Sequence, residues 1–176
     1  MKRFLKSLAV LPVFLIVLLN GCGYHTAGKA SHLPADLHVL AVPVFVNQTQ
    51  VFKIEQIMTR DVIREFIERT KYRVSNSSGD AADATLKGTV VSAQATPLTY
   101  DAQTGRASSA VVTVTLKVAL VDRSGRVLFE NQNYTFREQY QVSREIASFF
   151  DEETPGLQRM SRDFARTLVS DILEAY

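Results

Sequence analysis

Residues 84–100 read ATLKGTVVSAQATPLTY, and residues 108–122 read SSAVVTVTLKVALVD. Both stretches are rich in Val and Thr, β-branched residues that favour strands. Turn-forming residues at 101–106 separate them, so together they predict one antiparallel hairpin. Fifteen residues at about 3.3 Å each would make this hairpin roughly 50 Å long. The predicted inward face of its second strand carries Val112, Val114, Leu116, Val118 and Leu120.

The far end of this hairpin, residues 95–109, is predicted to project beyond the helices. The first predicted helix covers only about 30 Å at 1.5 Å per residue. Two strands without further cover are marginally stable alone, so two interpretations stay open: a floppy or bulged loop, or a tip that a partner orders. The partner-facing candidates in this polar, Ser/Thr-rich tip are Thr99, Tyr100, Asp101, Gln103, Thr104 and Gly105.

The first half of the domain pairs an apolar run with an amphipathic helix. Residues 38–46 are almost continuously apolar and predict a strand, which Pro43 places at a sheet edge or beside a bulge. Residues 47–49, Asn-Gln-Thr, supply N-cap chemistry for a helix over about 51–70. The apolar stripe of this helix comprises Ile54, Ile57, Met58, Val62, Ile63, Phe66 and Ile67.

The rest of the chain supplies two more strands and a closing helix. Strands are predicted over residues 72–74 and about 126–136, and Thr154 with Pro155 predicts the start of the last helix. Its buried stripe is Leu157, Met160, Phe164, Leu168 and Ile172. The element order β-α-β-β-β-β-α predicts an α+β two-layer sandwich. Its sheet would be mostly antiparallel with four to five strands, and both helices would cover one face.

The N-terminus has the pattern of an export signal. A basic start is followed by an apolar run at residues 8–19, which is shorter than the roughly 20 residues that span a bilayer as a helix. Residues 19–22, Leu-Asn-Gly-Cys, resemble a bacterial lipobox, and Cys22 is the only cysteine. The alternative is an ordinary signal peptide with a chance cysteine. We therefore predict a signal peptide over 1–21, a lipid-anchored tether over 22–37 and a single domain over 38–176.

Removal of the signal changes the charge of the chain. It takes away Lys2, Arg3 and Lys6, which leaves 17 basic against 18 acidic residues and a net charge of −1. Neither nucleic acid nor an anionic lipid surface is therefore favoured by bulk charge. With Cys22 acylated, no disulfide is possible, and the fold depends on its core. These features indicate a globular domain on a lipid tether, facing the periplasm or the cell surface.

No catalytic, metal or cofactor site is predicted. Cys22 is used by the anchor, and the sequence has neither a nucleophile-elbow pattern nor a phosphate-binding glycine loop. The three histidines at 25, 32 and 38 lack the spacing of metal ligands. The chain is therefore interpreted as a binding or assembly module, with a lipid-anchored hydrolase as a minor alternative.

Several blocks of the mature chain resemble one family. Residues 22–25, Cys-Gly-Tyr-His, are similar to the start of the outer-membrane LPS-assembly lipoproteins, the LptE-like family. Further similar blocks are LP at 33–34, LAVPVFVNQT at 40–49, IE at 54–55, EFIERTKYRV at 65–74 and ADATLKG at 82–88. The resemblance is strongest from residue 22 to 88 and weaker beyond.

The resemblance implies a specific role. Members plug the large β-barrel LPS translocon (LptD-like), one to one, and help it to assemble and to pass lipopolysaccharide outward. Gly23 is compatible with sorting to the outer membrane, and the domain would face the periplasm and the barrel lumen. Because lipid A phosphates favour Arg and Lys, Arg106 and Lys117 are the candidate phosphate contacts.

A second resemblance keeps another function open. The block at residues 39–49, followed by a helix and Tyr72-Arg73-Val74, is also similar to CsgG/LpoB-like periplasmic lipoproteins. Such a protein would form a secretion channel or activate a peptidoglycan synthase. The hairpin tip lacks the outward apolar alternation and aromatic girdles of a membrane barrel, which argues against the channel. An anchor in the inner membrane also remains possible from the residues alone.

Overall fold

A computed structural model describes residues 33–34, 36–77, 82–142, 150 and 155–174. The predicted signal peptide, Cys22 and the predicted cap at Thr154 lie outside the described residues. The end of the predicted tether is packed on the domain, because Leu33 and Leu37 belong to the core and are 8% and 5% exposed.

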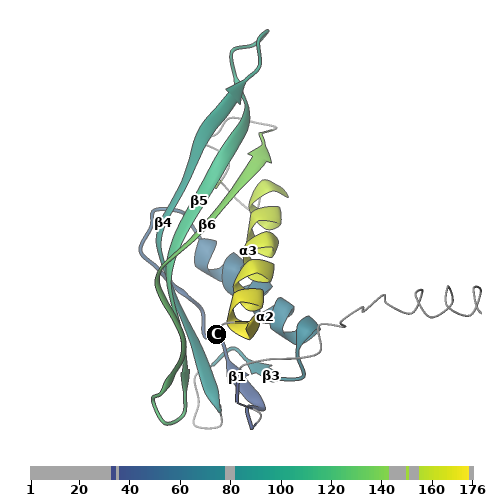
Figure 1. The fold of residues 1–176 in the computed structure, drawn as a ribbon. Helices are drawn as coiled ribbons and strands as arrows, with labels where there is room; N and C mark the ends of the chain where they lie inside the picture. The colour runs from purple at the N-terminus through teal and green to yellow at the C-terminus, as the bar shows by residue number, and fades with distance from the viewer. Residues whose placement is uncertain (1–32, 35, 78–81, 143–149, 151–154, 175–176) are drawn as a thin grey trace, which may run out of the picture. The chain divides into compact units, whose positions relative to one another are not determined.

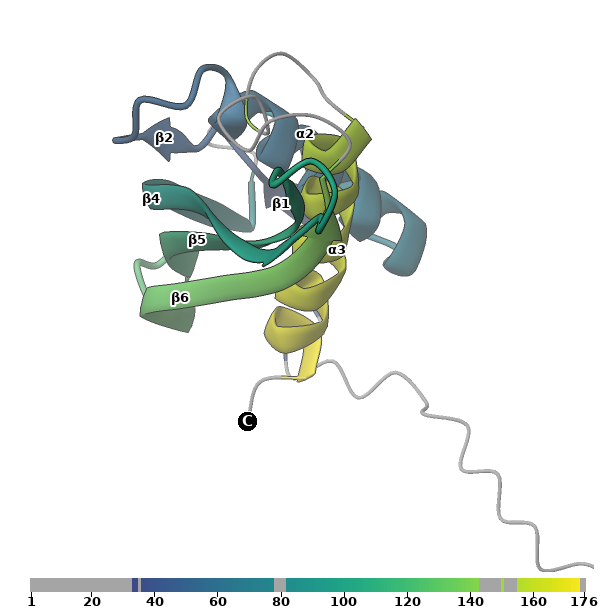
Figure 2. The same cartoon turned by 90° about the horizontal axis from the view of Figure 1, so that it is seen from above.

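The described chain forms one mixed sheet with two helices on one side of it, as Figures 1 and 2 show. In chain order the elements are β1 (Val39–Ala41), β2 (Val46–Asn47), α2 (Ile54–Arg69), β3 (Arg73–Ser75), β4 (Ala84–Tyr100), β5 (Ala107–Asp122), β6 (Val127–Gln141) and α3 (Pro155–Glu174). This confirms the predicted α+β two-layer sandwich.

The sheet has six strands, one more than predicted, in the order β3-β1-β4-β5-β6, with β2 paired separately to β4. The long ladders β4–β5 and β5–β6 are antiparallel, as predicted. The three short pairings β1–β3, β1–β4 and β2–β4 are parallel. Helix α2 supplies the crossover that the parallel pair β1 and β3 requires.

The predicted strand over 38–46 is divided, because backbone groups around Pro43 find partners other than β4. Pro43 has no N–H to donate, and Val42 N donates to Ser75 O at 2.7 Å. Phe45 N donates to the hydroxyl of Thr59 in α2 at 3.0 Å. Pairing with β4 therefore stops after β1 and resumes only at β2.

The start of α2 also differs from the prediction. The helix begins at Ile54 behind Lys53, whose φ of 57° is left-handed and which makes no side-chain cap. Asn47 instead accepts from Thr49 N and donates to Val51 O and Glu55 Oε2, so its amide organises the preceding turn. The prediction that Ile67 belongs to the buried apolar stripe is wrong, because its side chain is 57% exposed.

The core lies between the inward face of the sheet and the two helices. The predicted inward residues of β5 and the predicted stripe of α3 are all buried, as expected from their periodicity. Phe164 of α3 packs edge-on against Tyr134 and Phe136 of β6, with ring centroids 6.0 and 5.9 Å away. The Tyr134 hydroxyl donates to Asp171 at 2.7 Å, and burial followed by this carboxylate raises the pKa of Tyr134.

Candidate functional site

The two long strands end in a turn that their own residues close. The Asp101 carboxylate accepts from Thr104 N at 2.7 Å, from the Thr104 hydroxyl at 2.8 Å and from Gln103 N at 3.1 Å. The Thr104 hydroxyl, followed by its N–H, lowers the pKa of Asp101. Gly105 adopts the left-handed φ of 66° that favours glycine. The turn therefore needs no partner to set its shape.

The strands leading to this turn are irregular and uncovered. Register shifts interrupt the β4–β5 ladder between Pro97 and Thr99 and between Thr99 and Tyr100, so this end of the hairpin is bulged. Figure 1 shows it reaching past β6 and α3. All the partner-facing candidates are exposed: Thr99, Tyr100, Asp101, Gln103, Thr104 and Gly105. Their role as contacts stays a prediction.

The structure does not bring the two phosphate candidates together. Arg106 is exposed in the turn, whereas Lys117 is exposed in the middle of β5, roughly 35 Å farther along the strand. Lys117 instead lies diagonal to Lys87 of β4, because Lys117 pairs with Thr89 and Lys87 pairs with Ala119. Neither lysine forms an ion pair with another described residue. Lys87 was missed in the sequence, since only the ladder register places it there.

These lysines belong to the helix-free face of the sheet. Lys87 alternates with the buried Leu86 and Gly88, so its side chain leaves the face opposite the helices. Arg137 of β6 lies on the same face, and its Nε donates to the Thr113 hydroxyl at 3.3 Å. Threonine side chains surround these bases at positions 85, 89, 96, 113, 115 and 135. The face is thus polar, with basic groups able to bind anionic oxygens.

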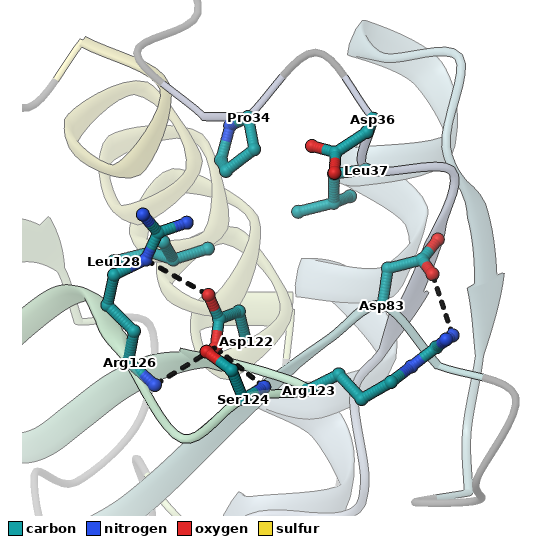
Figure 3. Close-up of a pocket in the computed structure, with 9 residues that line it drawn as sticks. All are labelled: Pro34, Asp36, Leu37, Asp83, Asp122, Arg123, Ser124, Arg126 and Leu128. Carbon is teal, nitrogen blue, oxygen red and sulfur yellow. Dashed lines mark hydrogen bonds and ion pairs between the residues drawn. The ribbon is translucent and has the colours of Figure 1, made fainter.

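The opposite end of the hairpin carries a small pocket of about 230 Å³ (Figure 3). Its walls are Pro34, Asp36, Leu37, Asp83, Asp122, Arg123, Ser124, Arg126 and Leu128. Arg123 pairs with Asp83 at 2.9 Å, and Arg126 pairs with Asp122 at 3.0 Å. Because a carboxylate neutralises each arginine, the pocket is not arranged as an anion site.

Asp83 ties three strands together at this end. Its carboxylate accepts from His38 N at 2.9 Å and Val39 N at 2.8 Å, which holds the start of β1. Its other oxygen accepts from Arg123 beyond β5. The His38 and Val39 amides are the main cause, ahead of Arg123, of the lowered pKa of Asp83. The pocket therefore marks a structural junction.

We expect Asp83→Asn to remove an acid-sensitive part of the stability. The pKa of the Asp83 carboxyl is lower in the folded protein than its value of 3.8 in the unfolded chain. Its contribution to the free energy of unfolding is therefore complete above pH 3.8, and it is lost as pH falls through the folded pKa. The variant should melt at a lower temperature than the parent at pH 7, and the gap between them should narrow as pH falls below 3.8. Thermal unfolding from pH 7 to 3 measures this. Asp36→Asn, an exposed change in the same pocket, is the control; a constant gap across pH would contradict the expectation.

Two further features bear on function. No helix in the described part of the chain is long and apolar enough to cross a membrane. Among the described residues, no group of three His, Cys, Asp or Glu side chains is arranged to hold a metal ion.

Comparison with known proteins gives one family match and several similar folds. Residues 37–172 match the family model LptE, described as lipopolysaccharide-assembly. No curated protein sequence matches the chain. A PelC dodecamer structure from Paraburkholderia phytofirmans has a TM-score of 0.50 at 16% identity, covering 78% of this chain and 90% of that chain. A DUF330-family protein from Xanthomonas campestris has a TM-score of 0.51 at 14% identity, covering 78% and 84%. At such identities these structures show a shared fold alone.

Proposed function

The chain belongs to the LptE family of lipopolysaccharide-assembly proteins, and from this we propose that it is the lipoprotein subunit of an outer-membrane LPS translocon. It plugs an LptD-like β-barrel one to one, assists the assembly of that barrel and aids the insertion of lipopolysaccharide. It acts as a binding subunit rather than an enzyme. The observation that carries the proposal is the extent of the family match, which runs from before β1 almost to the end of α3.

The surface chemistry of the domain supports a place inside a barrel. The interior of an outer-membrane barrel is polar. The helix-free face is rich in threonine, and the exposed hairpin end is uncharged apart from Asp101 and Arg106. A polar sheet face and a projecting turn that closes itself are better suited to a barrel lumen than to contact with lipid.

The anchor is proposed at Cys22, which is acylated and becomes the N-terminus of the mature chain when residues 1–21 are removed. Because a single acyl chain binds membranes only marginally, several chains on this cysteine would be needed for stable anchoring. From Cys22 to the buried Leu33 the extended chain reaches at most about 36 Å. This length holds the domain close to the membrane surface.

We expect Cys22→Ser to release the protein from the membrane. Without the thiol there is no acylation, so most of the protein should move from the membrane pellet to the soluble fraction or remain as uncleaved precursor. Fractionation with immunoblotting and mass spectrometry of the N-terminal peptide measures this. Asn20→Ser, which leaves the cysteine in place, is the control. An acyl-free Cys22 in the parent would contradict the anchor.

The phosphates of lipid A are proposed to bind at Arg106 and at the Lys87–Lys117 pair. A charge-assisted contact contributes about 1.5–3 kcal/mol, so Arg106→Glu with Lys117→Glu should weaken LPS binding about tenfold or more. Lys87→Glu should resemble Lys117→Glu, because the two ammonium groups are neighbours. Binding of purified LPS is the measurement. A matched control, Lys71→Glu with Arg159→Glu, makes the same charge change at exposed positions off the sheet; unchanged binding by the sheet variants would remove these residues as contacts.

Depletion of the protein in its own host tests the proposed function. The abundance and heat-modifiable mobility of the LPS translocon barrel are followed, together with co-purification from detergent-solubilised outer membrane. A one-to-one complex and misassembled barrel on depletion are expected. An intact barrel with no co-purification would contradict the plug and favour the secretion or peptidoglycan alternative.

A further inference from the structure

One edge of the sheet is open over much of its length. On the side of β4 away from β5, β1 pairs with Ala84 and Thr85, and β2 pairs with Thr89 and Val90. The last bond on this side runs from Gln48 N to Val90 O at 2.9 Å. Beyond Val90 no strand of the described chain pairs with this side of β4. We call residues 91–96 the open edge; it ends before Pro97, which has no N–H to donate.

The other outer edge of the sheet carries charges, whereas this one is interrupted only by the register shift at Val91 and by Pro97. Strand β6 carries Glu130, Arg137 and Glu138, charges of the kind that discourage edge-to-edge pairing. Strand β4 carries no charged residue from Val91 to Tyr100. The two edges therefore differ in charge, and only the β4 edge lacks charges that would oppose a further strand.

Exposed apolar residues occur within the open edge, beyond it in β4, and around β2. Eight large hydrophobic residues are exposed in the described chain, and six of them lie in β2, in the segments on either side of it, or in β4 beyond Val90, where only β5 pairs with β4. These six are Val44, Val46, Phe52, Val91, Leu98 and Tyr100. Backbone groups open to pairing and apolar side chains beside them are the two components of recognition by strand addition.

We propose that the open edge receives a short, extended and uncharged segment of the barrel partner, which adds to β4 as a further strand. The absence of charge over Val91–Tyr100 selects an uncharged occupant, and apolar side chains on that segment would cover Val91 and its neighbours. The six residues of the open edge provide about 20 Å of strand for pairing. This inference rests on the proposed function and names the part of the domain that the barrel binds.

Geometry disfavours the two other occupants. In an antiparallel pairing of two copies centred on the open edge, Pro97 and Leu98 of one copy would lie opposite Val90 and Thr89 of the other, where β2 already pairs. The tether joins the domain at Leu33, next to the pocket residues Pro34 and Leu37 at the opposite end of β4, so part of its length of about 36 Å would be used to reach the open edge. It also carries Lys29 and two histidines.

The test places charges on the open edge and, in a matched control, on the β6 edge. Gln94→Lys with Thr96→Lys alters the open edge, and Asn133→Lys with Gln141→Lys adds the same two charges to β6; all four positions are exposed. The full-length protein is expressed in its host and purified from solubilised outer membrane. We expect the amount of barrel that co-purifies with the open-edge variant to fall at least about tenfold. The control should co-purify as much barrel as the parent does. Both should melt within about 2 °C of the parent.

The outcomes separate the inference from the function on which it rests. If no barrel co-purifies with the parent protein, the proposed function is contradicted. If the parent and both variants retain the barrel equally, the function stands and the strand addition is overturned. A benzophenone cross-linker at Thr96 identifies the occupant: cross-links to a barrel segment support the proposal. Cross-links to a second copy or to residues 22–32 of the same chain overturn it.

Discussion

Replacing Phe164 with alanine is expected to lower the free energy of unfolding by about 3–5 kcal/mol. Phe164 is fully buried at the centre of α3. Its ring makes edge-on contacts with Tyr134 and Phe136, so the substitution removes both the buried apolar area and the contacts that join α3 to β6. Denaturant unfolding followed by circular dichroism measures the change.

A matched change on the surface separates core packing from loss of an aromatic ring as such. Phe52 is 74% exposed, so Phe52→Ala should change the free energy of unfolding by less than about 0.5 kcal/mol. Equal losses for the two variants would contradict the assignment of Phe164 to the core between α3 and β6.

Replacing Gly88 with alanine is the second large expected effect. In most strands this change would stabilise, because glycine in a strand interior costs roughly 0.5–1 kcal/mol relative to alanine. Here a Cβ on Gly88 would lie 2.6–2.8 Å from ring atoms of Phe45, which is 3% exposed. The ring has to move within a packed core, and we expect a loss of about 1–3 kcal/mol.

A double-mutant cycle tests whether Phe45 is the cause. Phe45→Leu removes the ring and should itself destabilise the protein, but it should also relieve most of the cost of Gly88→Ala. The two changes together should therefore cost less than the sum of the single changes, by about 0.5 kcal/mol or more. Additive costs would show that another constraint requires glycine at this position.

The secondary structure follows largely from local patterns. The strand pair predicted over 84–100 and 108–122 is observed as β4 and β5 with nearly the same bounds, since alternation over many residues has a period that a helix cannot satisfy. The predicted stripe of α3 is buried in full for the same reason, with a period of 3.6. Export and lipidation are also read from local chemistry at the N-terminus, and they stay predictions.

Local sequence patterns gave wrong bounds or wrong burial where segments far apart in the chain compete for the same partners. The apolar run at 38–46 looked like one strand, but Ser75 and Thr59 take the backbone donors on either side of Pro43. Ile67 fitted the helical stripe, yet it lies where neither the sheet nor α3 covers it and is 57% exposed. The predicted strand over 126–136 continues to Gln141, because β5 offers pairing partners as far as Ser109.

The candidate site also has parts that the sequence predicts and parts that only the tertiary structure reveals. Sequence was enough to place the tip residues 99–105 at the end of a projecting hairpin and to single out Arg106 and Lys117 by charge. The neighbour of Lys117, the close approach of Phe45 to Gly88 and the open edge of β4 all depend on register and strand order. Periodicity acts between residues a few positions apart, so the sequence alone specifies the elements and the face that each one buries. Register and strand order are set by hydrogen bonds and burial between segments far apart in the chain, and only the tertiary structure decides them.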